Sequence, residues 1–291
     1  MQPLFSIVIP TYNQAKKLQR AIESVLRQSN DDFEILVMDD GSRDNTGAVV
    51  ASFADSRITY TWEENFGGPA RPRNRGIGRA KGEWICFLDA DDWWAKDKLR
   101  ACLACINANV DLVYHPLRIV SEQRRMLRRK QIKSWQVGRP VLIDLLVNGN
   151  AIATSSVVVR KSLLEKIGGV NESVEMIASE DYNTWLRVAK VTDNFLYLPR
   201  TLGYYTHDQQ SLSHKDMSVP ERHAVAEFSS VLSAREQRKI EARLKYGSGK
   251  FQYVAGNYVE ATSALIFSAQ YGNMATRLKS ILLLTHILLK K

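Results

Sequence analysis

The sequence predicts an α/β fold in which a mostly parallel, twisted sheet is flanked by helices and followed by a helical C-terminal extension. Three observations predict it. Four short apolar runs alternate with helical patterns within residues 1–110, acids follow two of these runs, and the pattern becomes helical beyond about residue 219. Alternating strands and helices imply right-handed crossovers, which give parallel strands with helices on both faces.

Four strand and helix pairs make up the N-terminal part. We expect strands at residues 5–9, 33–38, 58–62 and 84–88, with a helix after each. Asn13 is the expected N-cap of the first helix, and Asp44, Asn45 and Thr46 form a capping signal for the second. The third helix, residues 70–80, tolerates Pro72 because its first turn needs no backbone N–H there. The fourth is expected over residues 96–108.

Polar segments follow three of the expected strands, at residues 10–13, 39–42 and 89–92. Ligands bind outside the carboxyl ends of strands in such sheets, so these segments are expected to face one crevice. Asp89, Asp91 and Asp92 lie so close that they raise one another's pKa unless a cation neutralises them. Hard oxygen ligands suit Mg²⁺ or Mn²⁺. A polar turn that only caps the next helix is the alternative.

Composition narrows the classes of partner and compartment. The net charge of +9 favours an anionic partner, which could be a nucleic acid, a phosphorylated substrate or an anionic membrane. The sharpest basic cluster lacks interleaved aromatic residues, so we expect a solvated hairpin there and no nucleic-acid binding. Its members are Arg124, Arg125, Arg128, Arg129, Lys130 and Lys133. Three cysteines, Cys86, Cys102 and Cys105, fit reduced thiols in a cytoplasmic protein, and residues 1–5 do not look like a signal peptide.

Seven motifs, taken in their order, resemble the family-two glycosyltransferases, inverting enzymes of the GT-A (Rossmann-like) fold that use a nucleotide-diphosphate sugar. They are FSIVIPTYN at residues 5–13, DDGS at 39–42, RNRG at 73–76, FLDADD at 87–92, GGVNE at 168–172, EDYNTWLR at 180–187, and His207 with Ser211 and Ser213. The resemblance covers about the first 215 residues. It implies a catalytic domain at residues 1–218, with a nucleotide-binding half at 1–110 and an acceptor and base half at 111–218. Residues 219–291 form a separate helical segment.

The resemblance also implies the donor site. The expected nucleotide-binding residues are Pro10, Thr11, Tyr12, Asp40, Arg73, Asp89 and Asp91. Asp40 would read the base, and the Arg73 guanidinium would offer forked donors to the diphosphate. Arg71, Asn74 and Arg75 are secondary candidates.

A divalent cation, Mn²⁺ or Mg²⁺, is implied as the cofactor. Asp91, Asp92 and His207 are its expected ligands, and the choice between Asp91 and Asp92 as main ligand stays open. The cation would stabilise the negative charge of the leaving nucleotide.

The resemblance places the catalytic base at Asp181, at the start of a helix. Asp181 would take the proton of the acceptor hydroxyl as its oxygen attacks the anomeric carbon. Glu180 competes for this role. The alternative is an acidic first helical turn favoured by the helix dipole alone.

We therefore expect an inverting, metal-dependent glycosyltransferase that moves a sugar from a nucleotide donor, expected to be UDP-linked, to a hydroxyl of a glycan or lipid-linked acceptor. The Gln-x-x-Arg-Trp motif of processive members is missing, so non-processive transfer is expected. Two alternatives are a nucleotidyltransferase and a non-catalytic nucleotide-sugar-binding protein. A nucleotidyltransferase would need a Gly-rich loop after the first strand, which residues 10–14 do not form. Motifs leave the sugar and the acceptor open.

Helical patterns continue in the C-terminal segment at residues 221–246, 251–271 and 277–291. Residues 281–289 are almost wholly apolar and are bracketed by Arg277, Lys279, Lys290 and Lys291. The run is too short for the ~20 residues that a bilayer-spanning helix needs. It is either an interfacial helix, peripheral at the inner face of the plasma membrane, or a helix that packs on its own domain or on a second subunit of a homo-oligomer.

Overall fold

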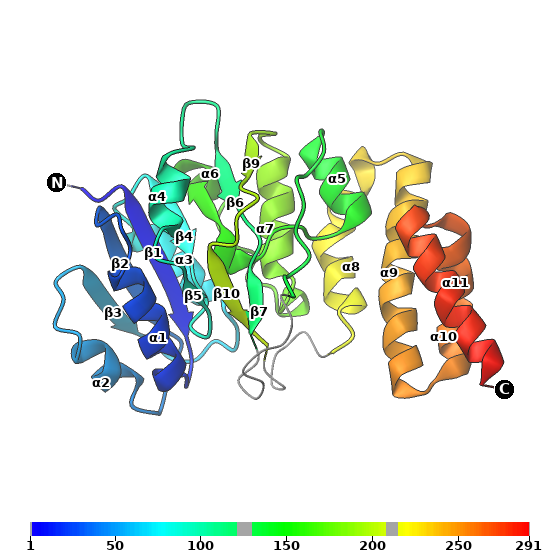
Figure 1. Ribbon diagram of the computed structural model, residues 1–291, viewed down its shortest axis with the longest axis horizontal. Coiled ribbons are helices and arrows are strands. Elements are labelled where there is room, and N and C mark those ends of the chain that lie inside the picture. Colours follow the sequence, from blue (N-terminus) through cyan, green and yellow to red (C-terminus); the bar gives the residue numbers. More distant parts are fainter. Residues whose placement is uncertain (1, 121–129, 208–214, 291) are drawn as a thin grey trace.

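The computed structural model describes residues 2–120, 130–207 and 215–290. The molecule is elongated, with the N-terminal strands at one end and the C-terminal helices at the other (Figure 1). Four of the six cations in the predicted basic cluster, Arg124 to Arg129, lie outside the described residues, as do Ser211 and Ser213.

The main sheet has seven strands in the order β3-β2-β1-β4-β8-β6-β9. Their bounds are β1 Phe5–Thr11, β2 Phe33–Asp39, β3 Ile58–Trp62, β4 Trp84–Phe87, β6 Leu112–Tyr114, β8 Val158–Arg160 and β9 Phe195–Tyr197. Only β8 pairs antiparallel with its neighbours in this sheet. The mostly parallel sheet predicted from the alternating pattern is confirmed.

Helices pack on both faces of this sheet (Figure 1). The helices up to residue 189 are α1 Ala15–Leu26, α2 Thr46–Ala51, α3 Ala70–Arg79, α4 Lys98–Leu103, α5 Val141–Asn148, α6 Lys161–Lys166 and α7 Glu180–Ala189, with 3-10 turns η1 Thr154–Ser156 and η2 Val174–Met176. Side chains of β1 alternate between two hydrophobic layers: Ile7 packs in the layer with Ile22 of α1, whereas Val8 packs in the layer with Trp185 of α7. Both faces are therefore buried, which explains the continuous apolar runs.

A small second sheet has the order β5-β10-β7, with β5 Trp93–Trp94, β7 Arg118–Val120 and β10 Gly203–Thr206. β5 directly follows the acid cluster, and β10 pairs with it antiparallel. The Thr206 N–H donates to the Asp92 carboxylate at 2.9 Å. The second sheet thus joins the acids to a segment more than a hundred residues away in the sequence.

The expected N-cap of α1 is wrong. Asn13 has a left-handed backbone, with φ of 51°, and its side-chain oxygen accepts the Arg43 N–H at 2.8 Å. The helix starts at Ala15, whose N–H donates to the Asp44 carboxylate at 3.1 Å. Asp44 also accepts the Thr46 N–H at 3.1 Å, so one carboxylate serves two helix starts. A contact between separate loops leaves no local pattern in the sequence.

The division of the C-terminal helices is also wrong. The observed elements are α8 Ser218–Ala226, η4 Ser229–Val231, α9 Ala234–Ala255, α10 Tyr258–Tyr271 and α11 Met274–Leu289. The Ser233 side chain and Glu236 form a capping box that starts α9 afresh, and Gly256 ends it in the left-handed conformation. No helix in the described part of the chain is long and apolar enough to cross a membrane.

Candidate active site

A cavity of about 630 Å³ lies at the carboxyl ends of the first strands. This volume is in the range of ~300–1,000 Å³ typical of small-molecule sites. The predicted residues that line it are Pro10, Thr11, Tyr12, Asp40, Arg73, Asp89, Asp91, Asp92, Glu180 and Asp181. The structure therefore brings the three predicted polar segments and the start of α7 into one crevice.

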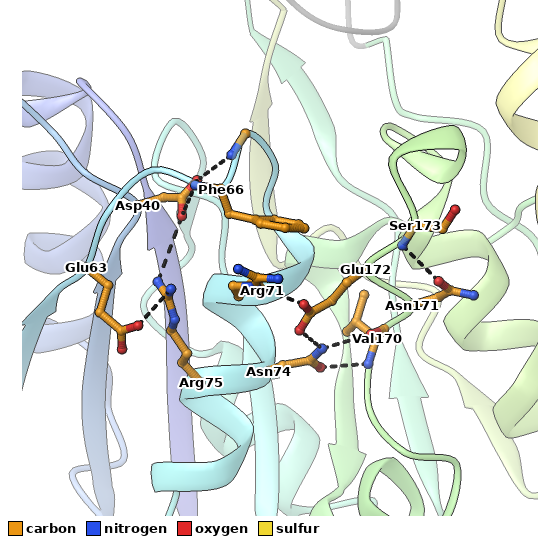
Figure 2. A network of polar contacts seen from close by, with 11 residues as sticks. Asp40, Glu63, Phe66, Arg71, Asn74, Arg75, Val170, Asn171, Glu172 and Ser173 are labelled. Atoms are coloured by element: carbon orange, nitrogen blue, oxygen red, sulfur yellow. Dashed lines mark hydrogen bonds and ion pairs between the residues drawn. The ribbon is translucent and has the colours of Figure 1, made fainter.

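Four other predicted residues do not line this cavity: Arg71, Asn74, Arg75 and His207. His207 directly follows β10, its side chain is exposed, and its N–H donates to the carbonyl of Val120 at 3.0 Å. The three α3 residues have partners elsewhere, in the network of Figure 2.

In Figure 2, Asn74 and Arg71 of α3 point toward the loop that carries Val170 and Glu172. The Asn74 amide donates to the Val170 carbonyl and to the Glu172 carboxylate, both at 2.8 Å, and accepts the Val170 N–H at 2.7 Å. Arg71 pairs with Glu172 at 2.9 Å and its guanidinium lies 3.5 Å from the centre of the Phe66 ring. These contacts fasten α3 to the loop at residues 170–172, about a hundred residues further along the chain.

Asp40 organises the loop beside the cavity. Its carboxylate accepts the N–H groups of Phe66 and Gly67 at 3.1 Å and the Asn65 amide at 3.3 Å, and Arg75 lies 3.8 Å away. Gly41 has φ of 85°, and a Cβ at this residue would lie 2.7 Å from the Asn65 nitrogen. Glycine is therefore needed here, and the result is a loop closed over a buried acid at one end of the cavity.

The acids after β4 differ in their surroundings. Asp92 is 1% exposed, and its pKa is raised well above the ordinary range by burial and by the charges of Asp91 and Asp89. Burial and the Asp89 charge raise the pKa of Asp91 to about 6. Arg20 of α1 holds this loop from outside: it donates to the Asp91 carbonyl at 2.7 Å and lies 3.8 Å from the centre of the Trp93 ring. No sequence motif pointed to Arg20.

The donor set suits a hard divalent cation. Within the described ranges, no three His, Cys, Asp or Glu side chains converge where they could hold an ion. An ion here would take one or two carboxylates and complete its shell with water and substrate phosphates, as Mg²⁺ commonly does. Asp91 and Asp92 both line the cavity, and one carboxylate oxygen of Asp92 accepts the Thr206 N–H.

Arg73 is the most buried cation of the site, with a side chain 5% exposed. One guanidinium nitrogen pairs with Glu180 at 2.6 Å and another with Asp89 at 2.8 Å. Sequence reasoning placed Arg73 beside a diphosphate but did not foresee these two carboxylates.

Asp181 lies in the first turn of α7. One carboxylate oxygen accepts the Thr154 hydroxyl at 2.8 Å and the other accepts the Tyr182 N–H at 2.6 Å. Burial and the neighbouring Glu180 charge raise the pKa of Asp181 to about 7, against the opposing effects of Arg73 and these hydrogen bonds. Thr154 and Ser155, whose hydroxyl accepts the Asp89 N–H at 3.1 Å, belong to η1, which no motif marked. The arrangement can therefore accept a proton near neutral pH.

The family model described as "Glycosyl transferase family 2" matches residues 6–168. A similar curated protein is the UDP-Glc:alpha-D-GlcNAc-diphosphoundecaprenol beta-1,3-glucosyltransferase WfgD of Escherichia coli, 31% identical over 188 residues, which are 64% of this chain and 70% of that protein. An uncharacterised glycosyltransferase of Rickettsia typhi is 29% identical over 72% of this chain and 66% of its own length. The chain thus spans about two thirds of these relatives.

Solved structures with the same fold include residues 1–349 of Staphylococcus aureus TarS in complex with UDP-GlcNAc. Its TM-score is 0.66, at 20% identity, over 94% of this chain and 82% of that one. The mannosyltransferase PcManGT of Pyrobaculum calidifontis, in complex with GDP-Man and Mn²⁺, gives a TM-score of 0.63 at 20% identity, over 99% of this chain and 81% of that one.

Proposed function

The chain belongs to glycosyl transferase family 2, and from this premise we propose that it is an inverting, metal-dependent enzyme that adds one sugar per encounter. Membership confirms the fold and the enzyme class expected from the sequence, and it argues against the nucleotidyltransferase and non-catalytic alternatives.

One observation carries it. The acids that follow β4 and the Asp181 carboxyl group line the same cavity, and that carboxyl group has a pKa of about 7. A base that must be ionised yet able to take a proton works best with a pKa near the operating pH. Glu180 is a poorer candidate, because it is 5% exposed and paired with Arg73.

We propose the following chemistry for Asp181. Its carboxylate takes the proton of the acceptor hydroxyl as that oxygen attacks the anomeric carbon. The bond from this carbon to the acceptor oxygen forms on one face of the sugar while the bond to the nucleoside diphosphate breaks on the other, so the configuration inverts. A positioned base contributes roughly two to four orders of magnitude in rate.

Asp91 is the proposed main ligand of the divalent cation, because it lines the cavity, whereas Asp92, which lines it too, has one carboxylate oxygen bound to the Thr206 N–H. Asp92 would act chiefly through the Thr206 N–H, by holding the loop in place. His207 directly follows Thr206 and stays a predicted further ligand. When bound, the cation supplies positive charge that stabilises the leaving diphosphate.

The donor is proposed to be UDP-linked and the acceptor a hydroxyl of a glycan or of a lipid-linked sugar. The name of the Escherichia coli relative includes both a UDP-linked donor and a diphosphoundecaprenol acceptor, and TarS was solved with UDP-GlcNAc. The Asp40 carboxylate, with Pro10, Thr11 and Tyr12 in the same lining, would form the base pocket.

The test is nucleotide release with a panel of UDP and GDP sugars and candidate acceptors, with and without Mn²⁺. We expect turnover that needs the cation, and a product of inverted anomeric configuration by NMR. Asp181→Asn should bind UDP normally and lose transfer. Retained configuration or normal turnover of this variant would remove Asp181 from the mechanism.

A lipid-linked acceptor makes peripheral membrane contact part of the proposal. α11 buries Thr276, Ser280 and Ile287 against its neighbours and exposes six large apolar side chains on its opposite side. These are Met274 (72%), Leu278 (58%), Ile281 (50%), Leu282 (70%), Leu288 (71%) and Leu289 (80%). Residues 261–291 contain four Lys or Arg and no acid, so this surface complements an anionic bilayer.

Flotation with neutral and with anionic vesicles tests the membrane contact. The wild type should float with anionic vesicles. The double variant that carries both Leu282→Glu and Leu289→Glu should not. Val254→Glu is the control, since Val254 is 75% exposed on α9. A stable dimer that dissociates in the α11 variant without any lipid binding would identify a second copy as the occupant instead.

A further inference from the structure

We propose that Arg73 is a positioning residue that ties the acid loop after β4 to the base helix α7, and that Glu180 is its anchor on that helix. The inference rests on the proposed role of Asp181 as base. It assigns to Arg73 a function other than the diphosphate contact that the family resemblance suggested.

Three elements meet at the Arg73 guanidinium. Arg73 belongs to α3, Asp89 directly follows the apolar run of β4, and Glu180 is the first residue of α7. The two ion pairs, 2.8 Å to Asp89 and 2.6 Å to Glu180, join residues 16 and 107 positions away in the sequence. One planar group therefore fixes the separation between the donor side of the cavity and the helix that carries Asp181.

Burial makes this bridge hard to break. The side chains of Arg73 and Glu180 are 5% and 6% exposed. If Arg73 turned toward a phosphate, Glu180 would remain as a buried carboxylate without its cation, which is costly. The guanidinium is thus held by two carboxylates before any substrate arrives, and its geometry is preorganised.

The same pair acts electrostatically on Asp181. Asp181 is faced by Glu180 on its own helix, by the Arg73 cation from α3 and by the neutral Thr154 hydroxyl from η1. The Glu180 charge raises the pKa of Asp181 and the Arg73 charge lowers it. Removing Arg73 should therefore raise the pKa of Asp181, and removing Glu180 should lower it.

The experiment measures nucleotide release against pH at saturating donor, for Arg73→Met, Glu180→Gln and the double variant. In Arg73→Met the acid limb of the rate profile should move to higher pH by on the order of one unit. In Glu180→Gln it should move to lower pH by a similar amount. The double variant should lie between them. Arg73→Lys keeps the charge but cannot bridge both carboxylates, so it should lose rate with a smaller movement of the limb.

Arg79→Met is the matched control, because Arg79 is an exposed residue of the same helix. Its acid limb should coincide with that of the wild type. If Arg73→Met does not fold, as judged by its thermal transition, Glu180→Gln still decides the question, since its amide oxygen can accept from Arg73.

A diphosphate role gives a different result: Arg73→Met and Arg73→Lys would raise the KM for donor and keep the rate at saturating donor. That outcome overturns the inference. Carboxyl titration of Asp181 by ¹³C NMR without substrate, assigned with Asp181→Asn, gives a readout independent of turnover. Failure of the proposed function looks different, because Asp181→Asn would then remain active or no donor would turn over.

Discussion

The raised pKa of Asp181 links the pH dependence of the rate to that of stability. With a pKa of about 7, the carboxyl group is about nine-tenths ionised at pH 8 and one-tenth ionised at pH 6. If Asp181 is the base, the rate of transfer should fall about tenfold between these pH values. An ordinary Asp, with a pKa of 3.8, would remain ionised and leave the rate unchanged.

Stability should change in the same pH window. Because the folded-state pKa of Asp181 is raised, its contribution to stability is fully present below pH 3.8 and is lost as the pH rises to about 7. Each pH unit in this window corresponds to about 1.4 kcal/mol. Asparagine cannot ionise, so the Asp181→Asn variant should be more stable than the wild type. The difference in the free energy of unfolding should be about 2 kcal/mol at pH 5.5 and about 4 kcal/mol at pH 8.

Two assays check this reasoning together. Nucleotide release from pH 5.5 to 9, with buffers of constant ionic strength, gives the acid limb. Urea unfolding of wild type and Asp181→Asn at pH 5.5 and 8 gives the stability difference, with Asp193→Asn as a control for removing an acid outside the cavity. An acid limb near pH 4 to 5, or a stability difference that does not grow with pH, would refute the assigned surroundings of Asp181.

Three further predictions concern the residues around this site. Asp91→Asn should raise the Mn²⁺ concentration for half-maximal activity on the order of tenfold or more without changing the fold, and an unchanged metal titration would contradict its role as ligand. Asn74→Ala should lose about 1–3 kcal/mol by urea unfolding, because it deletes the hydrogen bonds to Val170 and Glu172. Lys98→Met should raise the free energy of unfolding, measured in urea, by about 1–3 kcal/mol. The reason is that the Lys98 ammonium is fully buried, 3.5 Å from the centre of the Trp94 ring, and has no hydrogen-bond partner. A less stable variant would contradict this.

The positions of β1, β2 and β4 followed from the sequence because burial on both faces demands continuous apolar runs. The β1 and β2 runs are buried at every residue, so their pattern does not depend on distant partners. Helix ends were less predictable. Asp44 caps α1 across a loop, and α9 continues through residues 247–250 despite two glycines, because tertiary packing outweighs local propensity.

The site residues that directly follow a strand or stand at the start of a helix could be predicted from the sequence. Asp40, Asp91 and Asp181 all line the cavity, as expected from the motifs and from the meeting of strand ends at one edge. Thr154 and Arg20 were missed, since neither lies in a recognisable pattern. Asn74 and Arg71 were expected near the donor, yet their side chains bind Glu172 in the loop after α6 (Figure 2).

By itself the sequence determined the order of the four strand and helix pairs within residues 1–110, the family resemblance and the identity of the clustered acids, because each is encoded by short-range spacing. Only the tertiary structure decided how those acids differ. The buried Asp92 carboxylate accepts the Thr206 N–H, and the Arg73 guanidinium pairs with both Asp89 and Glu180. Asp181 has a pKa of about 7. The physical reason is that burial and the charges of residues distant in the sequence, which no local pattern records, set the energy of an ionised side chain.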